Sequence, residues 1–348
     1  MLADEVDYVI GVDTHRDQHT LAVVGAPTGA VVAQTVVGAN AAGYAQALRF
    51  ASRHAGVRAW AVEGAGHYGA GLARYLAERG EAVLEVGRHA RVERRLCGKD
   101  DPLDAIRAAR AGLAAETLSL PRAGQRQEAL RVLLLARRSA VDVRRVALVQ
   151  LRSLIVTAPE QLRDELRRLP LAQLIRRCSR FRRSGSRAPD ELAVVLTLRS
   201  LARRIENATA EADELEREIR QLVRTLAPDL LDEAGVGPIV AAQLIVSWSH
   251  RDRVRSEAAF ARLAGVAPLP ASSGQTIRHR LSRGGDRQLN RALHTVALHR
   301  RQHDPATRAY IARRLAEGKT AREATRILKR YLARHLYRVM QNATPLTT

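Results

Sequence analysis

The sequence is poor in cysteine and in aromatic residues. Its two cysteines, Cys97 and Cys178, lie far apart and show no CxxC or Cys/His spacing, so neither a zinc site nor a disulfide framework is indicated. Aromatic residues make up only 3% of the chain, so platforms for stacking unpaired bases are scarce. No uncharged apolar run reaches the roughly 20 residues that a membrane-spanning helix needs. The start, MLADEVDYVI, lacks the basic region of a signal peptide, and we therefore expect a soluble cytoplasmic protein.

Positive charge is abundant and unevenly placed. Residues 1–100 contain 11 basic and 11 acidic residues, and residues 101–250 contain 25 basic and 19 acidic residues. Residues 251–348 contain 21 basic residues against 6 acidic ones. Only three of the 57 basic residues are lysines, so the charge is carried by arginine, which can bind phosphate in a bidentate manner. This asymmetry indicates a polyanionic partner that is held mainly by the C-terminal part.

The N-terminal part alternates strand and helix patterns. β-branched apolar runs bounded by turn residues predict strands at 8–13, 19–25, 30–37, 57–63 and 81–86. Helical patterns lie at 41–55, 68–80 and 101–115. The first three strands read as an antiparallel meander, and the whole order describes an α/β domain of the ribonuclease-H-like kind. We place this domain at residues 1–120.

The middle of the chain has helical periodicity. Apolar residues at three- and four-residue spacing predict helix from 124 to 179, and a Ser/Gly/Arg/Pro break separates it from a second long helix at 191–226. The two segments could form an antiparallel hairpin or an intermolecular coiled coil, and a plain structural spacer is the alternative. We therefore expect a helical or coiled-coil connector at 121–228.

The last part, residues 229–348, is expected to be mostly helical and to bind DNA. LDEAGVGPIVAAQLIVSW places Gly235 and Gly237 between two helical stretches, as in helix-hairpin-helix motifs, whose backbone N–H groups bind a DNA phosphate. The plainer alternative is a helix end followed by a restart with Pro238 in the first turn. Two further helices are predicted at 285–301 and 306–341.

Four carboxylates are placed so that they could meet. Asp13 ends the first predicted strand and Glu63 ends the fourth, while KDDPLDA puts Asp101 and Asp104 at i, i+3 on one helix face. Such a cluster without basic partners repels itself unless cations bind, and Mg²⁺ suits ligands that are all oxygen. Two such ions could activate an attacking oxygen at phosphorus and stabilise the leaving one. Taken singly, each residue is also explained as a turn former, a helix cap or a helix-dipole partner, and Asp100 competes with Asp101.

A serine pair lies beside an arginine-rich segment in ASSGQTIRHRLSRGGDRQLNRAL, residues 271–293. Taken alone, Ser272 and Ser273 are most simply turn or helix-cap residues. The arginines of the segment form either a solvated face or a set of phosphate contacts. These arginines are Arg278, Arg280, Arg283, Arg287 and Arg291.

Several motifs carry a family resemblance. GVDTHRDQHTLAVV, AVEGAGHYGAGLARYL and KDDPLDA resemble the RuvC-like DEDD domain of the IS110 class of insertion-sequence transposases. This class includes the Piv/MooV DNA invertases and the bridge-RNA-guided recombinases. LDEAGVGPIVAAQLI, FARLAGVAPLPASSG and LSRGGDRQLNRAL resemble its C-terminal serine transposase domain in the same order. The likeness covers nearly the whole chain and is least informative in the helical middle.

The resemblance implies roles for individual residues. It makes Asp13, Glu63, Asp101 and Asp104 the Mg²⁺-binding DEDD tetrad, and it makes Ser273 the nucleophile that joins covalently to DNA, with Ser272 as its competitor. Nucleic-acid contacts are expected from the arginines named above and from Gly235, Gly237 and Gly274. Asn290 stands where an arginine is common, which we expect to weaken one backbone contact.

We therefore expect a DNA transposase or site-specific recombinase of an insertion sequence that forms a serine–DNA intermediate with the help of Mg²⁺. The resemblance further implies a bridge RNA as guide, a homodimer or homotetramer with sites built from different protomers, and a place on the bacterial nucleoid. Three alternatives stay open. They are a RuvC-like junction nuclease that uses only the tetrad, a DNA invertase without a guide RNA, and a nucleic-acid-binding protein with a degenerate site.

Overall fold

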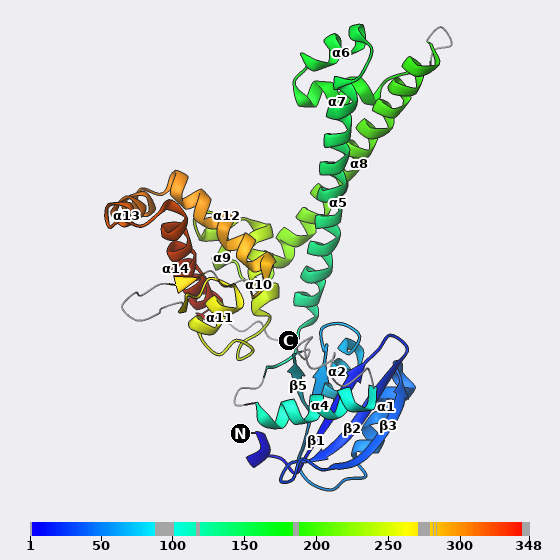
Figure 1. Ribbon diagram of the computed structural model, residues 1–348, viewed down its shortest axis with the longest axis vertical. Helices are drawn as coiled ribbons and strands as arrows, with labels where there is room; N and C mark the ends of the chain where they lie inside the picture. The colour runs from blue at the N-terminus through cyan, green and yellow to red at the C-terminus, as the bar shows by residue number, and fades with distance from the viewer. Residues whose placement is uncertain are drawn as a thin grey trace. The chain divides into compact units, whose positions relative to one another are not determined.

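The computed structural model describes most of the chain (Figure 1), namely residues 2–87, 101–115, 119–183, 188–270, 279–280, 282 and 284–342. The chain forms two compact units. One consists of Met1–Gly124 with Trp248–Ser256, and the other of Gln125–Ser247 with Glu257–Thr348. The three-part division expected from the sequence stays a prediction. Among the helices of the described ranges, none is long and apolar enough to cross a membrane.

The first unit is built on a five-stranded mixed sheet. Its strands are β1 (Tyr8–Thr14), β2 (Gln18–Gly25), β3 (Val31–Gly38), β4 (Arg58–Glu63) and β5 (Ala82–Val86). The order across the sheet is β3-β2-β1-β4-β5. β1, β2 and β3 pair antiparallel, whereas β4 is parallel to both β1 and β5. All five strands lie where the sequence pattern predicts them, with small shifts at their ends.

Helices cover both faces of this sheet. One face packs on α1 (Ala41–Ala51) and α2 (Ala70–Ala77), and its buried strand residues include Ile10, Val12 and Trp60. The other face packs on α4 (Asp101–Ala114), and its buried strand residues include Val9, Ala59 and Ala61. Since successive strand residues point to opposite faces, the apolar runs of β1 and β4 serve both layers at once.

The backbones of α4 and β1 meet at Gly11. A Cβ built on Gly11 would overlap the carbonyl oxygen of Ala105 and lie 2.5 Å from the nitrogen of Ala109. Further along α4, a Cβ built on Gly112 would lie 3.6 Å from a methyl carbon of Val9. Because Ala105 lies over Gly11 while Gly112 lies near Val9, α4 runs antiparallel to β1. The first turn of α4 is therefore directed toward the carboxyl end of β1.

A distant segment completes the first unit. The Ser249 hydroxyl accepts a hydrogen bond from the N–H of Ala123 and donates one to its carbonyl, both at 3.2 Å. His250 Nε2 lies 3.1 Å from the carbonyl oxygen of Pro121, and Arg253 lies 3.9 Å from the Glu85 carboxylate. These contacts fix Trp248–Ser256 against residues that precede it by more than a hundred positions.

The long helices of the second unit form an antiparallel hairpin (Figure 1). α5 (Gln125–Val156) pairs with α8 (Pro189–Leu226), and Arg137 bonds Glu216 across the pair at 2.7 Å. The hairpin is one of the two arrangements that the sequence left open. The helical pattern predicted over 124–179 is confirmed, but it is divided into three helices, because Pro159 and Pro170 cannot donate backbone hydrogen bonds and interrupt it. The segment continues as α6 (Glu160–Arg167) and α7 (Leu171–Ser179).

The C-terminal segment is mostly helical. Its elements are α9 (Asp229–Asp232), α10 (Pro238–Trp248), α11 (Glu257–Leu263), β6 (Leu269–Pro270), β7 (His279–Arg280), α12 (Arg287–His303), α13 (Pro305–Ala316) and α14 (Ala321–Asn342). The single helix expected over 306–341 is wrong, since the chain breaks at Gly318, which has a φ of +79°. Asp286 and Asp304 cap α12 and α13 with their carboxylates.

We expect Gly11→Ala to destabilise the first unit by about 2 kcal/mol, because the added methyl group forces α4 away from β1. Gly87→Ala is the matched control, since a Cβ at Gly87 meets nothing within 4 Å. Chemical denaturation of the full chain measures both changes. Equal stability of the two variants would show that α4 does not lie on β1 at this distance.

Candidate active site

Two of the four carboxylates lie side by side at one edge of the sheet. β1 and β4 pair in parallel with Val12 opposite Val62, so the next residues, Asp13 and Glu63, continue the same register. Asp13 lies two residues after Gly11, and Glu63 lies two residues after Ala61. Because every second strand residue points to the same face, both carboxylates belong to the sheet face that α4 covers. The Thr14 hydroxyl donates to the Glu63 carbonyl at 2.8 Å, which ties the two strand ends together.

The first turn of α4 brings the other two carboxylates toward this edge. The helix begins at Asp101, and Asp104 immediately precedes Ala105, the residue that touches Gly11. Asp101 contributes its backbone to the helix, and its side chain lies outside the described part of the structure. The carboxyl ends of β1 and β4 and the first turn of α4 thus lie toward the same edge of the sheet, and a shared site for Asp13, Glu63 and Asp104 stays a prediction.

The expectation that these carboxylates lack basic partners is wrong for two of them. His15 Nε2 lies 3.0 Å from Asp13 Oδ2, and Arg107 donates to Asp104 Oδ1 at 2.9 Å. His15 is two residues beyond Asp13 and Arg107 is one helical turn beyond Asp104, so both partners come from local spacing. The Asp13 side chain is 13% exposed and that of Asp104 is 20% exposed. Both carboxylates are thus oriented by a neighbour and largely shielded from solvent.

The donors at this edge suit a hard divalent cation. Within the described residues, no three His, Cys, Asp or Glu side chains are grouped closely enough to hold a metal ion. However, Asp101 falls outside that search, and the donors brought together are carboxylate oxygens, the ligands that Mg²⁺ takes. The side-chain chemistry and the shared sheet face therefore fit a divalent cation held between the sheet edge and α4.

The serine segment lies mostly outside the described residues, which exclude Ser272, Ser273, Gly274, Arg278, Arg283 and the side chain of Arg280. The base of the segment is described. β6 and β7 pair Leu269 with Arg280, and the N–H of Asp286 donates to the Leu263 carbonyl at 2.7 Å. A Cβ built on Gly285 would lie 2.8 Å from the nitrogen of Gly265. Close backbone contact thus closes the base of the segment that carries the serines.

The glycine turn before α10 is held by an ionic cluster. Glu233 accepts hydrogen bonds from Arg300 and from His335, each at 2.7 Å, and Arg300 also donates to the carbonyl of Ala234 at 2.8 Å. Burial alone would raise the pKa of Glu233, but the hydrogen bonds from His335 and Arg300 outweigh burial and lower this pKa. The helix before the turn, α9, has a single turn, so the likeness to a helix-hairpin-helix is partial.

The two glycines of this turn have different surroundings. Gly235 has a φ of +81°, and a Cβ there would lie 3.1 Å from the His299 side chain. Gly237 is exposed, its carbonyl accepts from the N–H of Ala241 at 2.9 Å, and a Cβ there would meet nothing within 4 Å. Gly235 is therefore required by the fold, whereas Gly237 leaves the amino end of α10 open to a phosphate.

Helix α12 presents two of the expected arginines to solvent. Arg287 and Arg291 are exposed one turn apart, and neither forms an ion pair with a carboxylate of the described residues. Asn290 lies between them on the inner side. Its amide donates to the Ala264 carbonyl at 2.7 Å, and its oxygen accepts from Lys329 Nζ at 2.5 Å. Burial lowers the pKa of Lys329.

This Asn290–Lys329 pair was missed by sequence reasoning. Asn290 was expected to be a weakened nucleic-acid contact, but it links α12 to α14 and to the residue before Gly265. The signal that could have found it is spacing. Asn290 is one position from Leu289 and three from Leu293, both buried, so it falls on the inner face of the helix.

We expect Gly235→Ala to lower the stability of the C-terminal helices by about 1–2 kcal/mol, because alanine is strained at positive φ and crowds His299. Gly237→Ala should leave stability unchanged and weaken DNA binding about fivefold, since it screens open backbone N–H groups. Thermal unfolding and fluorescence anisotropy with duplex DNA measure the two effects. Unchanged DNA binding by Gly237→Ala would remove this turn from the interface.

Comparison with known families finds two matches along the chain. Residues 10–158 match a model described as a transposase, of the DEDD type from IS110 elements. Residues 229–312 match the model described as the transposase IS116/IS110/IS902 family. The first match contains Asp13, Glu63 and α4, and the second contains the glycine turn and all of α12.

A curated relative agrees with both matches. The chain is 36% identical over 133 residues to a Streptomyces coelicolor A3(2) protein described as "Insertion element IS110 uncharacterized 43.6 kDa protein". The similarity covers 37% of this chain and 33% of that protein, about a third of each. A DEDD transposase domain suggests a ribonuclease-H-like fold, which agrees with the mixed sheet described above. The two domain matches, in this order, show that the chain is similar to transposases of the IS110 family over residues 10–158 and 229–312.

Proposed function

We propose that this protein cuts and rejoins DNA strands as the transposase of an insertion sequence, using a carboxylate site formed by Asp13, Glu63, Asp101 and Asp104. One observation carries the proposal: Asp13 and Glu63 continue one strand register on the face that α4 covers, and α4 begins with the other two aspartates. This arrangement lies inside the segment that matches a DEDD transposase.

The carboxylates would hold divalent cations, Mg²⁺ being the natural choice for oxygen ligands. When bound, such cations supply charge stabilisation at phosphorus and activation of an attacking oxygen. The protein's own residues orient the carboxylates: His15 bonds Asp13, Arg107 bonds Asp104, and Thr14 holds the backbone of Glu63. The amino end of α4 adds the positive end of a helix dipole, which favours negative groups there.

The C-terminal helices would hold the DNA backbone. The open amino end of α10 and the exposed Arg287 and Arg291 can contact phosphates without reading base sequence. Sequence choice would then come from another component, and we propose a guide RNA for this role, together with a homodimer or homotetramer. The family resemblance supports both, and the scarcity of aromatic residues agrees with recognition of backbones and duplex shape.

The central test is loss of DNA cleavage in Asp13→Asn and Glu63→Gln. The full chain, Mg²⁺ and RNA transcribed from the flanking DNA are incubated with labelled duplexes that cover the flanks of the gene, and products are separated on denaturing gels. We expect at least about a hundredfold loss of cleavage, with DNA binding retained, because these carboxylates act on the cations that serve the reaction.

Asp17→Asn is the matched control, since Asp17 is exposed, pairs with Arg16 and lies in the turn that follows Asp13. It should cleave like wild type. Full cleavage by Asp13→Asn would refute the proposal and favour a nucleic-acid-binding protein with a degenerate site. Wild-type cleavage with no joined products would favour the junction nuclease.

A covalent step through Ser273 is the finer part of the proposal. Its support is the likeness of the segment around Pro268 and Gly274 to the family's serine motif and the arginines that surround it. The DEDD domain argues the other way, because cations held by carboxylates can direct water or a DNA hydroxyl without a protein nucleophile. A serine hydroxyl would need activation from outside its own segment to compete.

Covalent trapping separates these two chemistries. Reactions are denatured and protein–DNA adducts are sought with wild type, Ser273→Ala and Ser272→Ala. The serine step predicts an adduct that disappears only in Ser273→Ala, since the missing oxygen is the one that bonds phosphorus. Cleaved DNA without an adduct in any lane would leave the carboxylate site as the sole source of chemistry.

A further inference from the structure

The helical hairpin and the segment between its helices have a cluster of positive charge of their own, separate from that of the C-terminal helices. Residues 101–250 contain 25 basic and 19 acidic residues, of which 13 basic and only 5 acidic lie in residues 152–204. The remainder of that section has 12 basic and 14 acidic residues. Its whole surplus therefore comes from residues 152–204, which run from the last turn of α5 through α6 and α7 and the segment that follows them to the first half of α8.

Much of this charge has no acidic partner. In the described part of this segment, ion pairs involve only Arg163, Arg167 and Arg177, which bond neighbouring carboxylates of α6. At the end of α7 and beyond it, Arg176, Arg180, Arg182 and Arg183 are exposed. On α8, the three arginines Arg199, Arg203 and Arg204 form no ion pair with any described carboxylate. Unpaired guanidinium groups at this density indicate a surface for an anionic partner.

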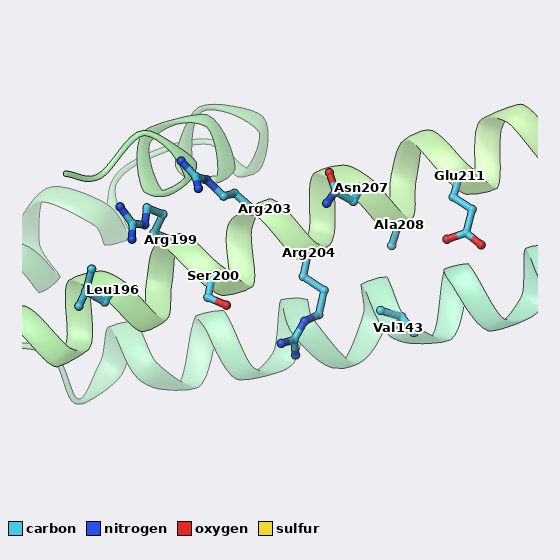
Figure 2. A pocket seen from close by; sticks show the side chains of 9 residues that line it. All are labelled: Val143, Leu196, Arg199, Ser200, Arg203, Arg204, Asn207, Ala208 and Glu211. Atoms are coloured by element: carbon cyan, nitrogen blue, oxygen red, sulfur yellow. The ribbon is translucent and has the colours of Figure 1, made fainter. Parts of the chain in front are cut away.

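A groove on α8 collects three of these side chains (Figure 2). It has a volume of about 490 Å³ and is lined by Arg199, Arg203 and Arg204, with the hydroxyl of Ser200 and the amide of Asn207 between and beside them. Arg204 and Ser200 point toward α5, whereas Arg199 and Arg203 point away from it (Figure 2). Glu211 lines the opposite end of the groove and limits the anion-binding part to the stretch from Arg199 to Asn207.

The arginines of the groove keep most of their hydrogen-bond donors available. Arg203 uses Nε to bond the Ser179 carbonyl at 3.3 Å, and Arg199 uses one terminal nitrogen to bond the Phe181 carbonyl at 3.4 Å. These bonds fix both guanidinium groups at the carboxyl end of α7. Each guanidinium has five N–H donors, so the rest can form bidentate bonds to phosphate oxygens.

We propose that the groove formed by Arg199, Ser200, Arg203, Arg204 and Asn207 binds the phosphodiester backbone of a nucleic-acid duplex. It would be a second polyanion surface, on the helical hairpin, in addition to the one proposed for the C-terminal helices. Arginine forks with hydroxyl and amide side chains are the groups that contact phosphate and sugar oxygens in such interfaces. The scarcity of aromatic residues excludes base stacking as its main mode of binding.

The test compares two triple variants of the full chain. Arg199→Gln/Arg203→Gln/Arg204→Gln removes the groove charges, and Arg217→Gln/Arg220→Gln/Arg224→Gln removes the same charge from the other half of α8. Binding to labelled DNA and RNA duplexes of about 30 base pairs and unrelated sequence is measured by anisotropy between about 50 and 200 mM salt. The two probes show whether DNA or RNA is the preferred source of the phosphates.

We expect the groove variant to bind at least one duplex about tenfold more weakly and its salt slope to fall by about 2.7, the value for three phosphate contacts. The control variant should stay close to wild type. Equal losses in both variants would mean that only net charge matters, and no loss in either would mean that the groove binds no backbone. Either result would overturn the proposal.

Arg204→Gln alone guards against a folding artefact, because Arg204 forms no hydrogen bond with the described residues. It should weaken binding by about threefold at unchanged melting temperature.

This proposal does not depend on strand cleavage. Asp13→Asn should keep the groove-dependent binding, so a failure of the proposed reaction and a failure of the groove give different results.

Discussion

The contact between α4 and β1 at Gly11 determines the geometry of the first unit. A helix backbone can approach a strand this closely only where the strand has no side chain, and Gly11 provides that position under Ala105 and Ala109. This close approach fixes both the distance of α4 from the sheet and the direction of its axis. Its first turn consequently lies toward the strand ends that carry Asp13 and Glu63. The candidate site depends on this backbone contact because its carboxylates come from three separate segments.

The second unit relies on polar links of a different kind. Glu233 holds the glycine turn through Arg300 and His335, and Asn290 holds the base of the serine segment through Ala264 and Lys329. These buried or half-buried bonds replace apolar packing where the chain must turn sharply. They leave exposed arginines on α12, while other unpaired arginines lie on α8. Phosphate contacts placed on both elements would position a long duplex without selecting its sequence.

Much of this arrangement could be predicted from the sequence. The strands are short β-branched runs bounded by turn residues, and this pattern alone predicts that Asp13 and Glu63 end two neighbouring strands. The breaks at Pro159, Pro170 and Gly318 were missed, because apolar periodicity continues across them. The partners His15 and Arg107 were also missed, although both are close in sequence to the carboxylates they bond. The carboxylate cluster was expected to be neutralised by bound metal cations and not by side chains of the protein. The groove on α8 could not be predicted, because it requires α5 and α8 to be paired in three dimensions.

The claim that sheet edge and helix share one cation site is tested most directly by Mn²⁺ binding, followed by electron paramagnetic resonance. The full chain is titrated with Mn²⁺ as wild type, Asp13→Asn and Asp104→Asn. If β1 and α4 contribute to one site, each variant alone should lose most of the bound Mn²⁺ that wild type retains. Binding that is lost in Asp13→Asn but unchanged in Asp104→Asn, or unchanged in both, would contradict a site shared by the two elements.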